Sequence, residues 1–340
     1  MISWIGISKS KFHDWKHRYG KANEYNGKVP RDNWTTRQEK EAIIDFFKNN
    51  PGNGYRRLCF MMIDQDVAYV SPATVYNILN RAGLMGKSNA RPSSKGKGFV
   101  QPSGPHRHWH VDISYINVCG TFFYLCSILD GYSRFVVNWE LRESMKEEDI
   151  EIIIEEARHK CGYVKPRIIS DNGPQFLARD FKEYIRLCGM DHVRTSPYYP
   201  QSNGKIERWH KELKKDCIRA QHLESLDEAK AAISEFVHHY NEVRLHSAIG
   251  YVTPRCKLEG HESEVFKTRD RKLEEARHRR KVIRANLRSC GQNEPSPEVL
   301  PASEIGYNKK DSREDKAMLG SNLSALESQG SQLKFYHASG

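Results

Sequence analysis

The order of strand and helix patterns between residues 108 and 214 most constrains the fold of this chain. Residues 108–118 alternate apolar and polar side chains with the period of a strand, and two further strand patterns follow. The dipeptide Asp130-Gly131 between the second and third patterns is typical of a two-residue hairpin. Helix and strand patterns then alternate through the rest of the segment. This order predicts an α/β fold with a mixed sheet and helices on both faces.

The later elements are short and well separated. We expect a helix at 146–161, a strand at 167–170, a helix at about 175–188, a short strand near 191–195 and a helix that carries Glu207. Three antiparallel strands followed by α-β-α-β-α is the order of the ribonuclease-H-like fold. The sequence therefore predicts a ribonuclease-H-like sheet.

Four helix patterns precede this region and predict a small all-α domain. The last of them has Ser71 as its cap and Pro72 in its first turn. Two short helices joined by a turn indicate a helix-turn-helix, although an ordinary helical bundle has the same apolar spacing. We expect five regions: a helix-turn-helix-like region at 1–85, a basic linker at 86–106, a catalytic core at 107–258, a basic helical extension at 259–290 and a disordered tail at 291–340.

Positive charge is concentrated on both sides of the middle region. The formal net charge is +11, and residues 1–106 carry 17 Lys and Arg against 8 Asp and Glu. Basic segments that flank a nearly neutral middle suit a nucleic acid held from both sides, although basic soluble surface has the same composition. No apolar run approaches the roughly 20 residues of a membrane span. We therefore expect a cytoplasmic protein without a membrane partner, associated with the nucleoid if its host is bacterial.

Three carboxylates stand at the expected ends of expected elements. Asp112 lies on the polar face of the first strand, Asp171 ends the strand at 167–170, and Glu207 lies 36 positions after Asp171. Each acid alone has an ordinary explanation as a strand, turn or helix-surface residue. Together they predict a site for divalent metal, because two-metal phosphoryl transfer needs several converging carboxylates. Lys214, two helical turns beyond Glu207, would share its face and could bind a phosphate.

These acids and their neighbouring motifs resemble the integrase catalytic core. The motifs are Asp171-Asn172-Gly173-Pro174-Gln175-Phe176, Gly204-Lys205-Ile206-Glu207-Arg208 and Tyr240-Asn241-Glu242-Val243-Arg244-Leu245-His246. The chain is most similar to insertion-sequence transposases of the two-reading-frame type, as the product of the second frame. It departs from their pattern at Leu245, where a proline is usual, and it lacks the leading region of the first frame.

The resemblance implies a DNA transposase or integrase that cleaves the ends of an insertion sequence and joins the freed 3′-hydroxyl to DNA. It implies Asp112, Asp171, Glu207 and Lys214 as catalytic residues, with the three acids holding two Mg²⁺ or Mn²⁺ ions. It also implies a homo-oligomer on DNA and a first-reading-frame product as a possible partner. A ribonuclease-H-type nuclease without strand transfer and a non-catalytic DNA-binding protein derived from a transposon are the alternatives.

Ten further residues are expected to contact DNA. Five lie in the helical region, where the outward face of its last helix and two consecutive arginines carry the prediction. Five lie near the acids, where amide, tyrosine and lysine side chains could contact the nucleic acid. The residues are Arg56, Arg57, Thr74, Asn77, Arg81, Asn172, Tyr199, Asn203, Lys205 and Lys211.

Overall fold

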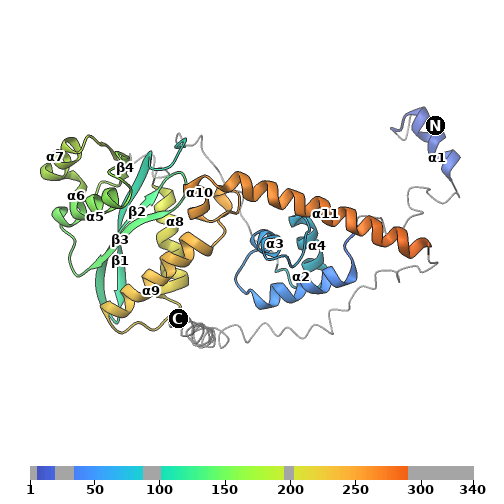
Figure 1. The fold of residues 1–340 in the computed structure, drawn as a ribbon, viewed down its shortest axis with the longest axis horizontal. Helices are drawn as coiled ribbons and strands as arrows, with labels where there is room; N and C mark the ends of the chain where they lie inside the picture. Colours follow the sequence, from blue (N-terminus) through green and yellow to red (C-terminus); the bar gives the residue numbers. More distant parts are fainter. Residues whose placement is uncertain (1–5, 20–33, 87–100, 195–202, 290–340) are drawn as a thin grey trace, which may run out of the picture. The chain divides into compact units, whose positions relative to one another are not determined.

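The computed structural model describes residues 6–19, 34–86, 101–194 and 203–289. The described chain forms two compact units, whose elements are labelled in Figure 1. The first unit combines the residues up to 86 with those from Phe266 onward, and the second consists of the residues between them. Within the described ranges, every helix is too short or too polar to cross a membrane.

Side chains cap the N-termini of the second and fourth helices in the first unit. The Thr36 hydroxyl accepts a hydrogen bond from the Glu39 amide at 3.2 Å, and the Glu39 carboxylate accepts one from the Thr36 amide at 2.8 Å. Ser71 caps the fourth helix, as expected, by accepting a hydrogen bond from the Thr74 amide at 3.3 Å. The helices are α1 (Lys9–Arg18), α2 (Arg37–Asn49), α3 (Tyr55–Asp64), α4 (Pro72–Arg81) and α11 (Glu262–Ser289).

The core of the first unit includes α11 as well as α2, α3 and α4. Leu273 of α11 packs against the buried side chains of the other three helices. Arg269 of the same helix is 4% exposed and forms a bidentate ion pair with Asp64, at 2.8 and 2.6 Å. From Phe266 onward, α11 is therefore packed into this unit. The buried residues that it helps to cover include Ile43, Leu58, Met62, Val75 and Leu79.

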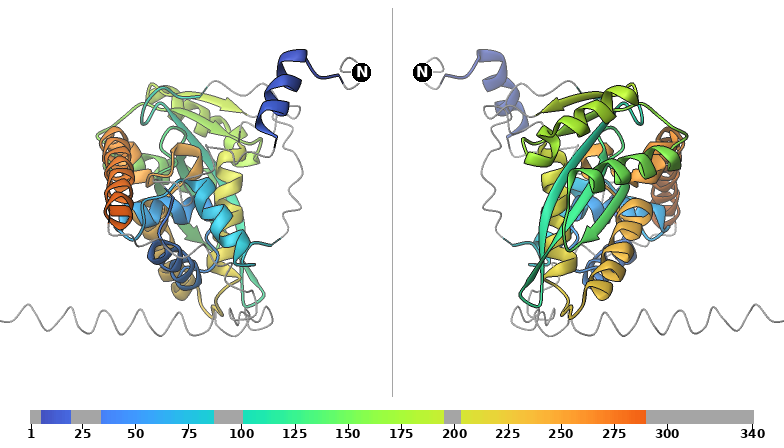
Figure 2. Two further views of the ribbon diagram at one scale, coloured as in Figure 1. Left: turned by 90° about the vertical axis from the view of Figure 1, so that its right-hand side faces the viewer. Right: turned by 90° about the vertical axis from the view of Figure 1, so that its left-hand side faces the viewer.

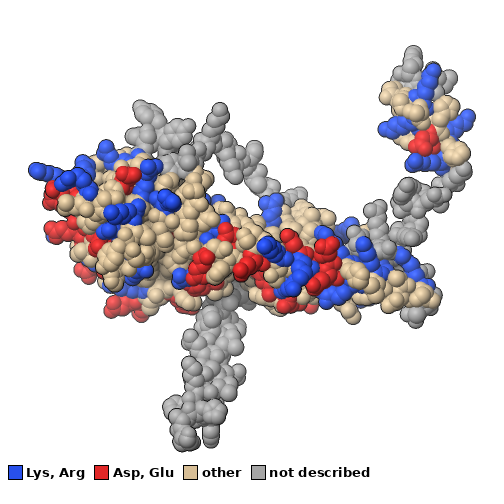
Figure 3. Space-filling model, turned by 45° about the horizontal axis from the view of Figure 1, so that its top comes forward, with Lys and Arg blue, Asp and Glu red and all other residues tan. Residues whose placement is uncertain are grey.

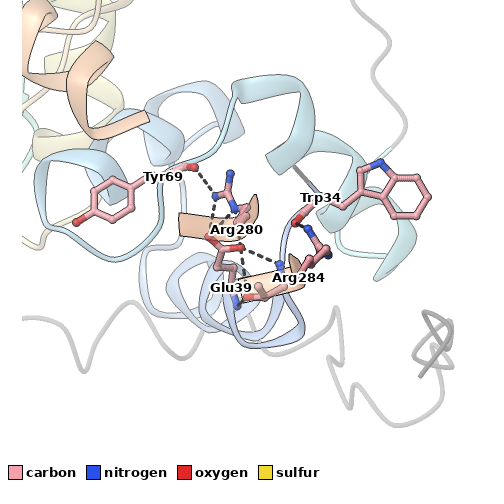
Figure 4. Close-up of polar contacts among 6 residues, drawn as sticks. Trp34, Glu39, Tyr69, Arg280 and Arg284 are labelled. Carbon is pink, nitrogen blue, oxygen red and sulfur yellow. Dashed lines mark hydrogen bonds and ion pairs between the residues drawn. The ribbon is translucent and has the colours of Figure 1, made fainter. Parts of the chain in front are cut away.

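A second group of polar contacts fixes α11 against the start of α2 (Figure 4). The Arg280 guanidinium donates to both carboxylate oxygens of Glu39, at 2.6 to 3.0 Å, and to the Tyr69 carbonyl at 2.6 Å. Arg284 donates to the Trp34 carbonyl at 2.7 Å. Both arginines are buried. Charged side chains that look suited to solvent therefore face the interior of this unit.

The second unit contains a five-stranded mixed sheet in the order β3-β2-β1-β4-β5. The central strand β1 pairs antiparallel with β2 and parallel with β4. The sheet confirms the expected α/β class and the three leading antiparallel strands. The strands are β1 (His108–Val118), β2 (Thr121–Asp130), β3 (Val136–Arg142), β4 (Arg167–Ser170) and β5 (Asp191–Arg194).

Helices cover both faces of this sheet (Figures 1 and 2). Trp109 and Val111 of β1 pack on the face covered by α5, α6 and α7. Ile116 and Val118, which have the opposite parity along the strand, pack on the face covered by α8 and α9. The helical segments are α5 (Glu147–Lys160), α6 (Pro174–Leu177), α7 (Arg179–Leu187), α8 (Gly204–Leu213), η4 (Lys214–Ile218), α9 (Leu226–His238), η5 (His239–Val243), η6 (Ser247–Ile249) and α10 (Pro254–Glu259).

The connection between β2 and β3 is longer than the two-residue hairpin that Asp130-Gly131 predicts. The buried Asp130 carboxylate accepts hydrogen bonds from the amide and hydroxyl of Ser133, both at 2.7 Å, and from the amide of Tyr132 at 3.2 Å. It also accepts one from the His106 amide at 2.8 Å. These bonds close the turn around the side chain, so the next strand begins only at Val136.

The single helix expected at 175–188 is two helices. Ala178 separates α6 from α7 with an extended backbone, at φ −55° and ψ 148°. Phe176 and Phe181 are both buried, with ring centroids 5.6 Å apart. Side chains five positions apart diverge on a continuous helix, which has 3.6 residues per turn. The interruption allows both rings to face the core.

Three expected segments lie wholly or largely outside the described residues. They are most of the linker expected at 86–106, the loop at 196–200 that contains Tyr199, and the tail at 291–340.

Candidate active site

Asp112 lies in the middle of the central strand and contacts α8. Its Oδ2 is 3.2 Å from Nδ1 of His210, and its Oδ1 accepts a hydrogen bond from the Ile113 amide at 3.0 Å. Nε2 of His210 lies 3.1 Å from the Ser127 hydroxyl on β2. The Asp112 carboxylate is therefore oriented by contacts on both of its oxygens.

The parallel pairing of β1 and β4 brings Asp171 beside Asp112. The register joins His110 to Ile169, and Asp112 and Asp171 each lie two residues further along. The Asp171 carboxylate accepts a hydrogen bond from the Gly173 amide at 2.9 Å, which holds it in the turn that follows β4. Both acids consequently lie at the same edge of the sheet.

Glu207 on α8 completes the set of acids. Burial raises its pKa, and the negative charges of Asp112 and Asp171 raise it further, while His210 lowers it. The charges of Asp112 and Asp171 therefore act on Glu207. The expected DNA contact Lys211 and the expected catalytic Lys214 lie on the same side of α8 and η4. Asp112, Ser114, Glu207, His210, Lys211, Lys214 and Arg219 line a cavity of about 310 Å³.

The donor set suits a hard divalent cation. Carboxylate oxygens are the ligands that Mg²⁺ prefers in proteins. A nearby cation would also favour the ionised form of Glu207, whose pKa the other two acids raise. In the described part of the chain, however, no three His, Cys, Asp or Glu side chains are close enough to form a metal site. The contact between His210 and Asp112 occupies one of the oxygens that such a site would use.

Lys214 carries a positive charge at the edge of this cavity. Burial and the neighbouring Arg219 lower its pKa, whereas Asp112 raises it. Among the expected DNA contacts near the acids, Asn172 lies in the exposed turn after Asp171. Tyr199 is outside the described residues. Lys214 and Lys211 are therefore the expected cations that the structure brings to the acids.

Two expected DNA contacts at the start of α8 are buried or partly buried. Asn203 is 3% exposed. The Lys205 ammonium donates a hydrogen bond to the Gly131 carbonyl at 2.7 Å. Burial and the positive charge of Arg134 lower the pKa of Lys205 to about 8, against the opposing effect of Asp130. Lys205 thus belongs to a second group of residues beside the first cavity.

The helical unit gathers three of its five expected DNA contacts. Thr74, Asn77 and Arg81 project from α4 into a cavity of about 470 Å³, which Lys40 of α2 and Arg277 of α11 also line. The other two do not line that cavity: Arg56 is exposed, and Arg57 donates a hydrogen bond to Asn53 at 3.1 Å. Figure 3 shows Lys and Arg interspersed with Asp and Glu on the face that it presents, so the basic character is distributed and not one continuous patch there.

The sequence did not mark His210 or Arg219 as parts of the site. His210 falls on the apolar stripe of its helix, which predicts a core residue, and no local pattern shows that Asp112 lies opposite. Arg219 follows the π-helical turn η4, which sequence periodicity does not predict. The signal that could have found His210 is a titratable residue at a position that should be apolar.

Comparisons with known proteins match the part of the chain that contains these residues. Two family profiles described as "Integrase core domain" match residues 102–200 and 188–254. The chain is 30% identical over 185 residues to the insertion element IS136 uncharacterized protein Atu4601 of Agrobacterium fabrum, covering 52% of this chain and 95% of that protein. It is 25% identical over 217 residues to the insertion element IS476 uncharacterized 39.2 kDa protein of Xanthomonas euvesicatoria, covering 62% of each. Other relatives are described as insertion-sequence transposases.

The integrase core domain and these relatives define a polynucleotidyl transferase of the transposase and integrase class. The chain belongs to the insertion-sequence transposases of the integrase superfamily. Among solved structures, the HTLV-2 integrase catalytic core domain in complex with magnesium is similar with a TM-score of 0.35 and 20% identity. That similarity covers 46% of this chain and 97% of that one.

Proposed function

We propose that this chain catalyses metal-dependent cleavage of DNA at the ends of an insertion sequence and transfers the freed 3′-hydroxyl to another phosphodiester. The observation that supports the proposal is that β1 and β4, which carry or precede Asp112 and Asp171, are paired in parallel, and that the charges of both acids act on Glu207.

The three acids would hold divalent metal, with Mg²⁺ or Mn²⁺ as the ions suited to their oxygens. Two such ions, when bound, supply activation of the attacking oxygen and stabilisation of the leaving oxygen. The protein itself orients the carboxylates that would bind these ions. His210 holds Asp112 from α8, and the amide of Gly173 holds Asp171 in its turn. A carboxylate fixed in this way loses less conformational entropy when a ligand binds.

Lys211 and Lys214 would bind the DNA phosphates beside the acids. Both line the cavity of Asp112 and Glu207, and a lysine ammonium is a mobile point charge that suits phosphate oxygens. The helical unit would bind DNA through α4, where Thr74, Asn77 and Arg81 share one cavity. A homo-oligomer on the DNA and a first-reading-frame partner belong to the same proposal.

The decisive experiment compares the wild type with Glu207→Gln on a supercoiled donor plasmid that carries the element's ends, in Mg²⁺. We expect cleavage and joined products to fall by more than about 100-fold, because loss of a metal ligand exceeds the effect of losing its supporting contacts. Glu183→Gln is the matched control, since Glu183 is an exposed acid on α7 that pairs with Arg186 at 3.7 Å. Equal activity of Glu207→Gln and wild type would refute the site.

The same reaction separates the alternative functions. Strand cleavage without joined products, lost in Glu207→Gln, would identify a ribonuclease-H-type nuclease. DNA binding without any cleavage by the wild type would identify a non-catalytic protein derived from such an element.

A further inference from the structure

A second cavity lies beside Glu207 and has no part in the mechanism above. Its volume is about 570 Å³, larger than the cavity of the acids. Three parts of the second, sheet-containing unit (the catalytic unit) form it: the turn between β2 and β3, the exposed end of α8, and the segment that follows α9. Its lining includes Arg134, Lys205, Glu207, Trp209, Tyr240 and His246.

Arg134 lines this cavity, and its guanidinium lacks a direct partner among the described residues. Its side chain forms no hydrogen bond or ion pair with any residue that the structure describes. Burial lowers the pKa of its guanidinium, which also interacts electrostatically with Tyr240, Asp130 and Arg208. A partly buried guanidinium that lacks a direct partner carries a cost that a ligand could offset.

The backbone of Arg134 adds to that cost. Its φ is +66°, in the left-handed region where glycine or asparagine is favoured. Its amide donates to the Asp130 carbonyl at 3.0 Å, a bond that any residue other than proline could make. Neither the turn nor the core therefore requires arginine at this position. The presence of a guanidinium there points to a role in the cavity.

A second cation and a helix terminus add positive charge beside Arg134 in the same cavity. The Lys205 ammonium lies nearby and uses one of its three protons on the Gly131 carbonyl. The N-terminus of α8, which begins at Gly204, adds partial positive charge.

The acids around this cavity are already paired. Glu212 lies 3.2 Å from Arg244 and 3.5 Å from Arg208. Asp130 accepts hydrogen bonds from three residues through its two oxygens. The cavity consequently presents donors and positive charge from three elements. Among the described residues that line it, Glu207 is the one carboxylate left to balance them.

We propose that this cavity binds a phosphate of the DNA backbone, with the Arg134 guanidinium as its donor. The inference rests on the proposed function, because it assigns a place to the strand that Glu207 acts on. The guanidinium can donate to two phosphate oxygens at once. Since Glu207 lines both cavities, the bound phosphate lies near the bond to be cut and positions it.

The test uses the full-length protein and a duplex with the element's end, without divalent metal, so that binding is measured apart from catalysis. Arg134→Gly removes the cation and relieves the left-handed backbone. We expect roughly tenfold weaker binding and a salt dependence about one unit shallower for each phosphate that the variant no longer neutralises. We also expect a melting temperature equal to or above that of the wild type. Arg186→Gln is the control for the removal of an exposed positive charge. Glutamine is used there because glycine would weaken the helix that carries Arg186.

Methylphosphonate substitution locates the phosphate. At one position of the duplex, neutralising a phosphate should weaken wild-type binding by the same factor as Arg134→Gly, and it should not weaken the variant further. Absence of any such position, or an unchanged affinity and salt dependence in folded Arg134→Gly, would overturn the proposal. Arg134→Asn, which also tolerates a positive φ, carries the test if the glycine variant fails to fold.

Failure here is distinguishable from failure of the proposed function. If Glu207→Gln abolishes joining while Arg134→Gly binds like the wild type, the phosphate subsite is wrong and the transposase stands. If the wild type neither binds nor joins DNA, the proposed function fails and the subsite fails with it.

Discussion

The ion pair between Arg280 and Glu39 should hold the helical unit together. Their side chains are 7% and 22% exposed, and the guanidinium also donates a hydrogen bond to the Tyr69 carbonyl. Removing one member of a buried pair costs roughly 3–5 kcal/mol. Because Glu39 is partly exposed and keeps its bonds to Thr36, we expect Arg280→Met to lower the free energy of unfolding by about 2–3 kcal/mol, less than that range.

The sign of the pH dependence provides a second check on this pair. Burial opposes ionisation of Glu39, but its hydrogen bonds to Arg280 and Thr36 prevail and lower its pKa. A lowered carboxyl pKa adds stability above the unfolded value, and this stability is lost as the pH falls through the folded value. Arg280→Met should remove part of this stability. The variant should therefore lose less additional stability than the wild type when the pH falls below about 4.5.

Peptide-resolved hydrogen exchange on the full chain is the appropriate assay, because thermal unfolding of two units need not be a single transition. Exchange should accelerate together in α2, α3, α4 and α11. Arg271→Met is the matched control: Arg271 lies on the same helix, is 69% exposed and pairs with Glu275 at 3.9 Å. Equal effects of the two substitutions, or acceleration confined to α11, would refute the role of the pair.

Two further predictions concern His192 and Arg81. Burial, together with the charges of Arg194 and Lys182, lowers the pKa of His192 to about 4, so the folded state should lose stability as the pH falls from about 6.5 to 4. His192→Gln should flatten acid unfolding in that window, and an unchanged slope would contradict the assignment. Arg81→Gln should make the salt dependence of DNA binding about one unit shallower if its cavity on α4 contacts a phosphate; an unchanged slope would remove α4 from the interface.

Local sequence patterns correctly predicted those features of helices and strands that depend only on neighbouring residues. Ser71 caps the helix that it should cap, because capping depends on residues three positions away. The alternation of β1 placed Asp112 correctly opposite Trp109. Tyr115 has the same parity as Trp109, yet Tyr115 is 58% exposed while Ile116 is buried on the other face. A strand covered on both faces does not show simple alternation.

Long-range contacts were not predictable in this way. The arginines of α11 have the composition of a solvated helix, and only the fold shows that Arg280 meets Glu39, 241 positions earlier. Asp130-Gly131 predicted a tight two-residue hairpin, but the Asp130 carboxylate accepts a hydrogen bond from the distant His106 amide. The local sequence pattern does not show this contact. That Asp112 and Asp171 lie on or directly after neighbouring strands was inferable, since strand order fixes which strands are neighbours.

The helical unit is interrupted in the sequence by the whole of the catalytic unit, and this has a consequence during synthesis. Ribosomes add roughly 5–20 residues per second, so α2, α3 and α4 should precede the residues after Phe266 by roughly 10–40 s. During that interval, Leu273 cannot cover their core and Glu39 lacks its arginine partner. A nascent chain would therefore complete the sheet-containing unit before the helical unit that is proposed to bind DNA. This order disfavours tight DNA binding by incompletely synthesised chains.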